Sequence, residues 1–144
     1  MAKKLDLFIN GKFIESKTKD WLEVLDPSTQ EVLCDVPLTT KEEINLAVES
    51  AKNAFLDWRD TPPPERSRVM MRYQELLKKN QEEIAKILSK ENGKTFEDAK
   101  GDVWRGIEVV EQAANITPLL MGETVENVAR EIDSYSYIQS LGVC

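Results

Sequence analysis

The amino-acid sequence predicts a mixed α/β fold, and three observations support this. The first 37 residues combine tight-turn signals with short apolar runs, which is typical of paired strands. From Thr40 the apolar residues recur at three- and four-residue spacing, which is typical of helices. Near the end, Tyr135 and Tyr137 alternate with serines, which predicts a further strand. The 144 residues have the length of one domain, which could bury about two thirds of its extended surface.

Two β-hairpins are expected in residues 1–37. Asn10 and Gly11 lie between two apolar runs, and both positions of a two-residue hairpin turn need a positive φ, which these residue types tolerate. A second turn, Asp-Pro-Ser-Thr at residues 26–29, separates two further apolar runs, the last of which closes at Pro37. The four strands are expected at residues 7–9, 13–14, 22–25 and 31–36.

Four helices are expected in residues 40–117. Thr40 with Glu43, and Asn80 with Glu83, have the spacing of a capping box, which marks a helix start. Three successive prolines cannot continue a helix, so they separate the first from the second. The expected starts are Thr40, Glu65, Asn80 and Thr95.

The ends and apolar faces of these helices can also be predicted. The third should end at Asn92 and Gly93, because glycine suits the left-handed position after a helix, and Pro118 should stop the fourth. The apolar stripe of the second helix is expected to face inward. In chain order the four stripes are Ile44, Ala47, Val48, Ala51, Ala54 and Phe55; Val69, Tyr73, Leu76 and Leu77; Ile84, Ile87 and Leu88; and Phe96, Ala99, Val103, Ile107, Val110 and Ala114.

The end of the chain, residues 133–144, is expected to form an apolar strand without a polar tail. Such a strand needs a neighbouring strand, so we expect the chain to be part of a longer polypeptide. The isolated chain is then expected to aggregate or to bind a partner through residues 134–144.

Composition excludes several classes of function. Nineteen basic and 26 acidic residues give a net charge of -7, which disfavours nucleic acid as a partner. No apolar run approaches a membrane span and no targeting segment is evident, so the chain as written is expected in the cytoplasm. Cys34 and Cys144 suit neither a disulfide framework nor a zinc site, and each is expected to be a small buried hydrophobic residue. The absence of histidine removes the commonest general base and metal ligand.

Two local motifs are better explained by helix ends than by chemistry. Gly93 begins a Gly-Lys-Thr sequence of the kind that ends a phosphate-binding loop, but the first glycine of that motif is missing. The carboxylate pairs at residues 42–43 and 82–83 fall in first turns, where the helix dipole favours negative charge.

Arg105 is the candidate functional residue. It lies near Gly101 and Gly106, which are unfavourable in a helix interior and suggest that another group approaches the backbone closely. Two interpretations are open. Arg105 could form surface ion pairs with Asp102 and Glu108, three positions away on either side, or it could bind a carboxylate through two parallel hydrogen bonds.

Five stretches of the chain occur in an order that is shared with a known family. They are LFINGKFIES, DPSTQEVLCDVPLTTKEEINLAVESAKNAFLDWRD, ERSRVMMRYQELLKKNQEEIAKILSKENGKTFEDAKGDVWRGIEVVEQA, LLMGET and LGVC. Together they resemble the N-terminal part of the aldehyde dehydrogenase superfamily. GDVWRGIEVVEQA, LLMGET and YSY more narrowly resemble its CoA-acylating branch, which acts on methylmalonate and malonate semialdehydes. The resemblance covers almost the whole chain.

The resemblance implies that residues 1–144 form the N-terminal portion of an aldehyde dehydrogenase fold with an incomplete Rossmann-like NAD domain. Within it, residues 133–144 would supply the oligomerisation strand and the start of the NAD fold. A complete relative would use NAD and coenzyme A and form a homo-oligomer, a tetramer or a dimer. It would belong to valine, thymine or inositol catabolism. In a eukaryote it would work in the mitochondrial matrix.

The resemblance also assigns residues. Arg105 aligns with the arginine that holds the substrate carboxylate. In the family, the nucleophilic cysteine and the NAD-binding loops occur later in the sequence. No catalytic, cofactor-binding or metal-binding residue is therefore expected in this chain. The isolated chain should neither bind NAD nor oxidise the semialdehyde. Cys144 matches a strand cysteine. Ile138 and Ser140 depart from the basic residue and the proline that are common at those positions, which affects the expected geometry of the oligomerisation strand.

An alternative from another class of function is that the chain is a non-catalytic partner or capping protein that associates with a full-length aldehyde dehydrogenase. Its helices and its tyrosine-containing strand would supply the contacts.

Overall fold

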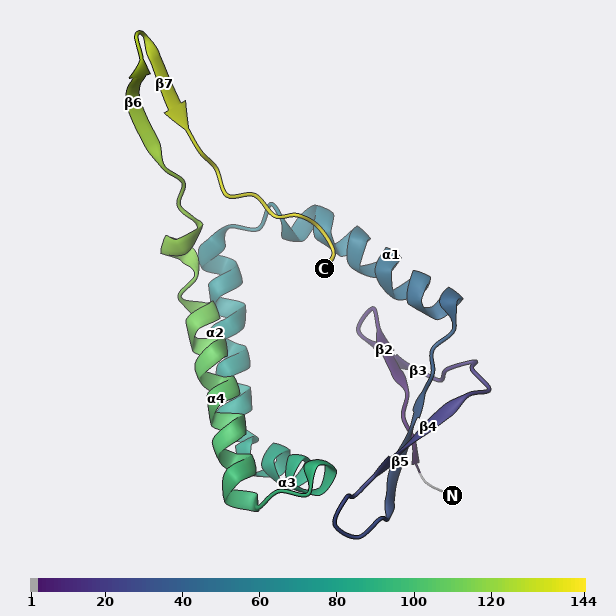
Figure 1. Ribbon diagram of the computed structural model, residues 1–144. Helices are drawn as coiled ribbons and strands as arrows, with labels where there is room; N and C mark the ends of the chain where they lie inside the picture. Colours follow the sequence, from purple (N-terminus) through teal and green to yellow (C-terminus); the bar gives the residue numbers. More distant parts are fainter. Residues whose placement is uncertain (1–2) are drawn as a thin grey trace.

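The structure is a computed structural model that describes residues 3–144 (Figure 1). Within these residues, five strands, β1 to β5, precede four helices, α1 to α4, and a 3-10 helix η1 leads to a last pair of strands, β6 and β7. The expected mixed α/β class is therefore confirmed. The elements follow an open arc, in which the β-strands of the first part and the paired helices α2 and α4 occupy opposite sides.

The first predicted hairpin is confirmed. Strands β2 (Leu7–Ile9) and β3 (Lys12–Ile14) pair in antiparallel fashion. Asn10 and Gly11 connect them with φ values of 52° and 72°, as a two-residue turn of this kind requires.

The second hairpin is also confirmed, with a small addition. Strands β4 (Trp21–Leu25) and β5 (Val32–Pro37) are antiparallel, and the Asp26 carboxylate accepts hydrogen bonds from two backbone N–H groups of the turn. A short strand that the sequence did not suggest, β1 (Lys3–Lys4), adds to β5 in parallel and gives the order β1-β5-β4.

Helix α1 (Lys41–Trp58) begins with the predicted capping box. The Thr40 hydroxyl accepts from the Glu43 N–H, and the Glu43 carboxylate accepts from the Thr40 N–H at 2.9 Å. The same buried carboxylate also accepts from the Ser16 hydroxyl at 3.0 Å and the Lys17 N–H at 2.7 Å. These N–H groups, that of Lys17 most of all, lower the pKa of Glu43 because they stabilise its ionised form. One side chain therefore joins the start of α1 to the segment after β3.

Helices α2 (Pro63–Lys79), α3 (Gln81–Asn92) and α4 (Phe96–Ala114) form what we call the helical unit. Helix α4 packs along α2 and against α3 (Figure 1). The predicted stripe of α4 is confirmed, because all its members are buried or half-buried. Ile107 is 1% exposed, and it is the one large side chain among residues 3–144 that is fully buried. The other buried apolar residues of the helical unit are Ala85, Ala99 and Ala114.

Helix α2 differs from its prediction in its start and its orientation. It begins at Pro63 rather than Glu65, because proline is well tolerated in a first helical turn, where its missing N–H has no intrahelical partner. The inward orientation predicted for most of its stripe is wrong. Ser67 is the buried residue that faces α4, where its hydroxyl donates to the Ala114 carbonyl, and the exposed members of the stripe are Val69, Tyr73 and Leu76.

The capping box predicted for α3 is wrong. Asn80 is at once the residue after α2 and the residue before α3, and its side-chain amide donates to the Leu76 carbonyl at 2.7 Å. The side chain thus satisfies the end of α2 and makes no cap bond to α3. The predicted end of α3 is confirmed, because Gly93 follows it with a φ of 67°. Helix α4 ends at Ala114, before Pro118 is reached.

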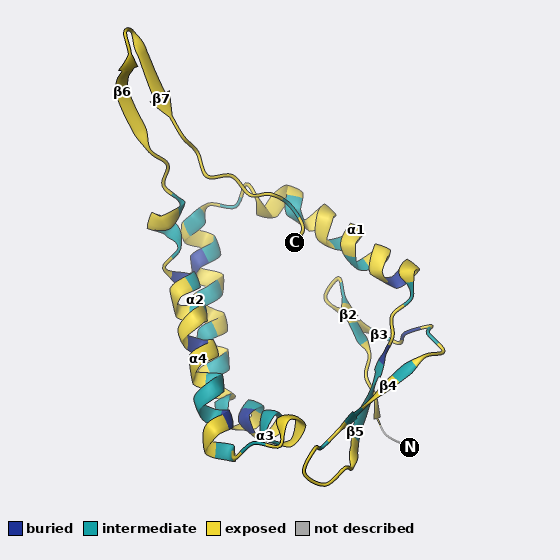
Figure 2. Cartoon of the chain, viewed as in Figure 1, coloured by how far each residue is buried: buried dark blue, intermediate teal, exposed yellow. Residues whose placement is uncertain are grey.

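The last strand is shorter than expected. After η1 (Thr117–Leu120), strands β6 (Thr124–Ala129) and β7 (Ile132–Tyr135) form an antiparallel hairpin, which we call the β6–β7 hairpin. The strand predicted through residues 133–144 ends at Tyr135 in the structure. The Ser136 N–H still donates to the Glu123 carbonyl at 2.8 Å, but no strand among residues 3–144 pairs with the residues after it. Every residue of the hairpin is exposed (Figure 2).

The chain buries little of its surface. Its accessible surface is 11570 Å², whereas a compact folded protein of 16.4 kDa exposes about 7,500 Å². The compact core that the chain length allowed is therefore absent, since the helical unit, α1 and the strands scarcely cover one another (Figure 2). No helix in residues 3–144 combines the length and the apolar content needed to span a bilayer.

Candidate functional site

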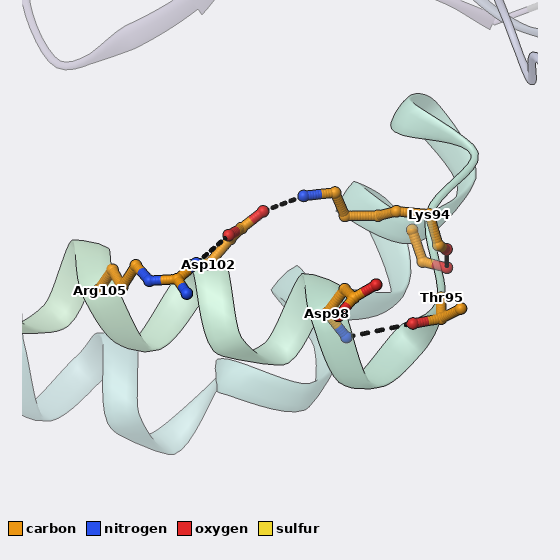
Figure 3. Close-up of polar contacts among 6 residues, drawn as sticks. Lys94, Thr95, Asp98, Asp102 and Arg105 are labelled. Carbon is orange, nitrogen blue, oxygen red and sulfur yellow. Dashed lines mark hydrogen bonds and ion pairs between the residues drawn. The ribbon is translucent and has the colours of Figure 1, made fainter.

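Arg105 lies on the solvent-facing side of α4, where its side chain is 76% exposed. Its Nη1 donates a hydrogen bond to Oδ1 of Asp102 at 2.7 Å, one helical turn earlier (Figure 3). A guanidinium has five N–H donors, so this bond leaves most of its hydrogen-bonding capacity for another acceptor.

Asp102 is half-buried and lies between two cations. Its second oxygen, Oδ2, accepts an ion-paired hydrogen bond from Nζ of Lys94, on the side away from Arg105 (Figure 3). The hydrogen bond from Lys94 is the largest cause of a lowered pKa at Asp102, and Arg105 adds to the effect. We refer to Lys94, Asp102 and Arg105 as the charged cluster.

The other predicted partner of Arg105 is engaged elsewhere. Glu108 accepts a hydrogen bond from the indole N–H of Trp104 at 3.2 Å, and the ion pairs of residues 3–144 do not include one between Glu108 and Arg105. The surface ion pair expected for Arg105 therefore exists on one side only.

The turn between α3 and α4 brings Lys94 to Asp102. Gly93 ends α3 in the left-handed conformation, and the Ser89 hydroxyl then holds the Lys94 carbonyl at 2.7 Å. Thr95 starts α4, and its hydroxyl accepts from the Asp98 N–H at 3.3 Å. Because the backbone of the turn is fixed at both ends, the Lys94 side chain is directed along the first turns of α4 (Figure 3).

The close approach expected at the glycines of α4 does not come from residues 3–144. A Cβ atom added at Gly101 or Gly106 would have no other group within 4 Å. Both positions face open space in this chain, so the reason for glycine there is not a contact within it.

Other features of the chain lie away from Arg105. A hollow of about 810 Å³ is formed by the end of α1, the start of α2, Leu120 and residues 138–141, and Arg105 does not line it. Both cysteines are free; Cys34 is half-buried and Cys144 is exposed, so the burial expected for Cys144 is wrong in this chain, where the terminal segment has no covering layer. Residues 3–144 contain no cluster of three metal-ligating side chains.

The chain belongs to the aldehyde dehydrogenase family, whose model matches residues 13–144.

The relatives define the match more narrowly. A Dictyostelium discoideum protein assigned as a mitochondrial methylmalonate-semialdehyde/malonate-semialdehyde dehydrogenase [acylating] is 56% identical over 144 residues, 100% of this chain and 27% of its own length. The Homo sapiens enzyme of that name is 49% identical over 138 residues, 96% of this chain and 26% of its own.

Solved structures agree. One from Sinorhizobium meliloti 1021, assigned as a methylmalonate-semialdehyde dehydrogenase and complexed with NAD, superposes with a TM-score of 0.92 at 40% identity, over 99% of this chain and 29% of its own. The chain thus corresponds to the N-terminal part of these enzymes and spans little more than a quarter of their length.

Proposed function

We propose that the complete protein to which this chain corresponds is an NAD-dependent, CoA-acylating methylmalonate/malonate-semialdehyde dehydrogenase, with residues 1–144 as its N-terminal part. The observation that carries the proposal is the 56% identity to a relative so assigned, which extends over all 144 residues. In the reaction, NAD accepts the hydride and coenzyme A accepts the acyl group, after attack on the aldehyde by a cysteine thiolate that lies outside this chain.

The role that we propose for Arg105 is to bind the carboxylate of the semialdehyde. Three features support it: a permanent positive charge, a side chain that is 76% exposed, and a guanidinium edge that the bond to Asp102 leaves open. A planar guanidinium fits a carboxylate with two parallel hydrogen bonds, so a substrate that carries this group gains an interaction that a neutral aldehyde of similar size cannot make.

Three further proposals concern the complete protein. It is a homo-oligomer, a tetramer or a dimer, to whose sheet the segment at Tyr135 contributes; the exposure of the β6–β7 hairpin supports this. It acts in valine, thymine or inositol catabolism. In a eukaryote it works in the mitochondrial matrix, and otherwise in the cytoplasm; the named eukaryotic relatives are mitochondrial.

The alternative, a non-catalytic partner of a full-length aldehyde dehydrogenase, is favoured by one observation. The surface of the chain exceeds that of a compact protein by about 4,000 Å², and a second polypeptide could cover it. Mixing the chain with a full-length relative distinguishes the two, because a capping protein would form a stable complex during gel filtration.

The proposed function is tested by the formation of NADH from methylmalonate semialdehyde and coenzyme A. The complete protein should show turnover that requires coenzyme A, and the purified 144-residue chain should show none. Turnover by the chain alone would contradict the assignment of the chemistry to residues outside it. A complete protein that oxidises other aldehydes but not carboxylated ones would contradict the substrate class.

A further inference from the structure

We propose that Asp102 is a positioning residue for Arg105 and that Lys94 offsets its charge, so that the charged cluster presents one net positive charge to the substrate carboxylate. The inference rests on the proposed function of Arg105 and assigns roles to two residues beyond it.

The first step concerns position. Arg105 is exposed and has a long side chain, which would lose much rotamer freedom when it binds a ligand. Its bond to Asp102, at 2.7 Å and one helical turn away, already restricts the guanidinium before a ligand arrives. A ligand then binds to a side chain that is partly ordered, which reduces the entropy lost on binding.

The second step concerns charge. A carboxylate beside Arg105 would by itself repel the substrate carboxylate and neutralise the arginine. Lys94 removes this difficulty because it pairs with the other oxygen of Asp102. Two cations and one anion leave a single positive charge, and it is located on the exposed member of the cluster.

The third step concerns how the lysine is held. Lys94 lies outside α4, and its backbone is fixed by the left-handed Gly93 and by the hydrogen bond from Ser89. The Lys94 ammonium therefore reaches Asp102 from a turn whose backbone is held by hydrogen bonds, and the Lys94 side chain is 33% exposed. This arrangement differs from a surface ion pair between two mobile side chains, which contributes little.

The structure offers a matched control in Glu108. It lies three positions after Arg105, as Asp102 lies three positions before it, and it bonds to Trp104 instead. Removal of either carboxylate changes the local charge by the same amount, but only removal of Asp102 releases Arg105.

The test uses the complete enzyme and the ratio of kcat/KM for methylmalonate semialdehyde to kcat/KM for propanal, which lacks the carboxylate. Asp102→Ala should lower this ratio about tenfold, mainly through KM for the carboxylated substrate. Asp102→Asn keeps an acceptor for Arg105 without a negative charge, so its ratio should equal or exceed that of the parent enzyme. Lys94→Met should lower the ratio about threefold, and Glu108→Ala should change it by less than about twofold.

Arg105→Leu in the same series separates the two proposals. If it abolishes the preference for the carboxylated substrate while Asp102→Ala and Lys94→Met leave the ratio unchanged, the role of Arg105 stands and the present inference is wrong. The inference is equally wrong if Glu108→Ala matches Asp102→Ala. If Arg105→Leu itself leaves the preference intact, both proposals are wrong. Lys94→Met leaves α4 unaltered, so it decides the matter if Asp102→Ala fails to fold.

Discussion

The helical unit and the β6–β7 hairpin differ in where their stability comes from. In the helical unit, Ile107 is 1% exposed on α4, which packs along α2 and against α3. In the hairpin, Ile132 is 55% exposed, and the strands are joined by backbone hydrogen bonds without a layer behind them. A two-stranded hairpin is marginally stable alone. We therefore expect contacts outside this chain to order it in the proposed complete protein.

The contrast extends to surfaces within the helical unit. The buried face of α2 is the one that carries Ser67, whereas the face with Val69, Tyr73 and Leu76 is open. The helical unit thus has a core of its own and still leaves an apolar face open. Burial in this chain therefore follows the packing of α4 rather than the apolar pattern of each element.

The largest difference in stability between the helical unit and the β6–β7 hairpin should come from Ile107→Ala. In the helical unit it should lower the free energy of unfolding by about 2 to 5 kcal/mol, because it leaves a cavity among α2, α3 and α4. Its matched control, Ile132→Ala in the hairpin, should change the free energy by less than about 0.5 kcal/mol. Urea unfolding of the 144-residue chain, followed by far-ultraviolet circular dichroism, measures both. Similar losses in the two variants would remove the contrast.

A smaller effect is expected at the turn between α3 and α4. Gly93→Ala should destabilise the helical unit by about 1 to 2 kcal/mol, because φ is 67° and the new Cβ would lie 2.6 Å from Cγ of Pro27. The control is Gly101→Ala, which meets no group within 4 Å in a helix interior, and which should stabilise the isolated chain by about 0.5 to 1 kcal/mol. Thermal unfolding of the two variants compares them. A change of stability in the same direction for both variants would contradict this prediction.

The smallest effect concerns pH. The pKa of Asp102 is lowered in the folded chain, chiefly by Lys94, so its ionised form stabilises the helical unit at pH values above the ordinary aspartate pKa. This contribution should be lost as the pH falls through the folded-state pKa. The stability difference between the parent chain and Asp102→Asn should therefore shrink between neutral pH and acid. A difference that grows on acidification would show that the sign is wrong.

Local signals predicted the elements that depend on local chemistry. Asn10 and Gly11 define a turn through their own backbone preferences, and Thr40 with Glu43 defines a helix start through bonds within four residues. The capping box predicted at Asn80 was wrong because the end of α2 and the start of α3 compete for the same side chain. Sequence spacing does not show which of the two helix ends the side chain will bond. Strand β6 was missed because Asn127 has a positive φ and the register shifts within the strand, which breaks the two-residue period.

In the candidate site too, the sequence predicted only contacts within one helix. Helical spacing predicts Asp102 as a partner of Arg105, and the structure has that bond. The same spacing also predicted Glu108, which Trp104 engages. Lys94 could not be found in this way, because it reaches Asp102 from a turn, where no helical period applies.

Hydrogen exchange can show whether the helical unit is ordered by its own contacts and the β6–β7 hairpin by contacts outside this chain. Amide protection would be measured in the 144-residue chain and in the complete enzyme. We predict protected amides around Ile107 in both, and protection of residues 124–135 in the complete enzyme alone. Equal protection of the hairpin in the two proteins, or an unprotected α4 in the isolated chain, would contradict the account.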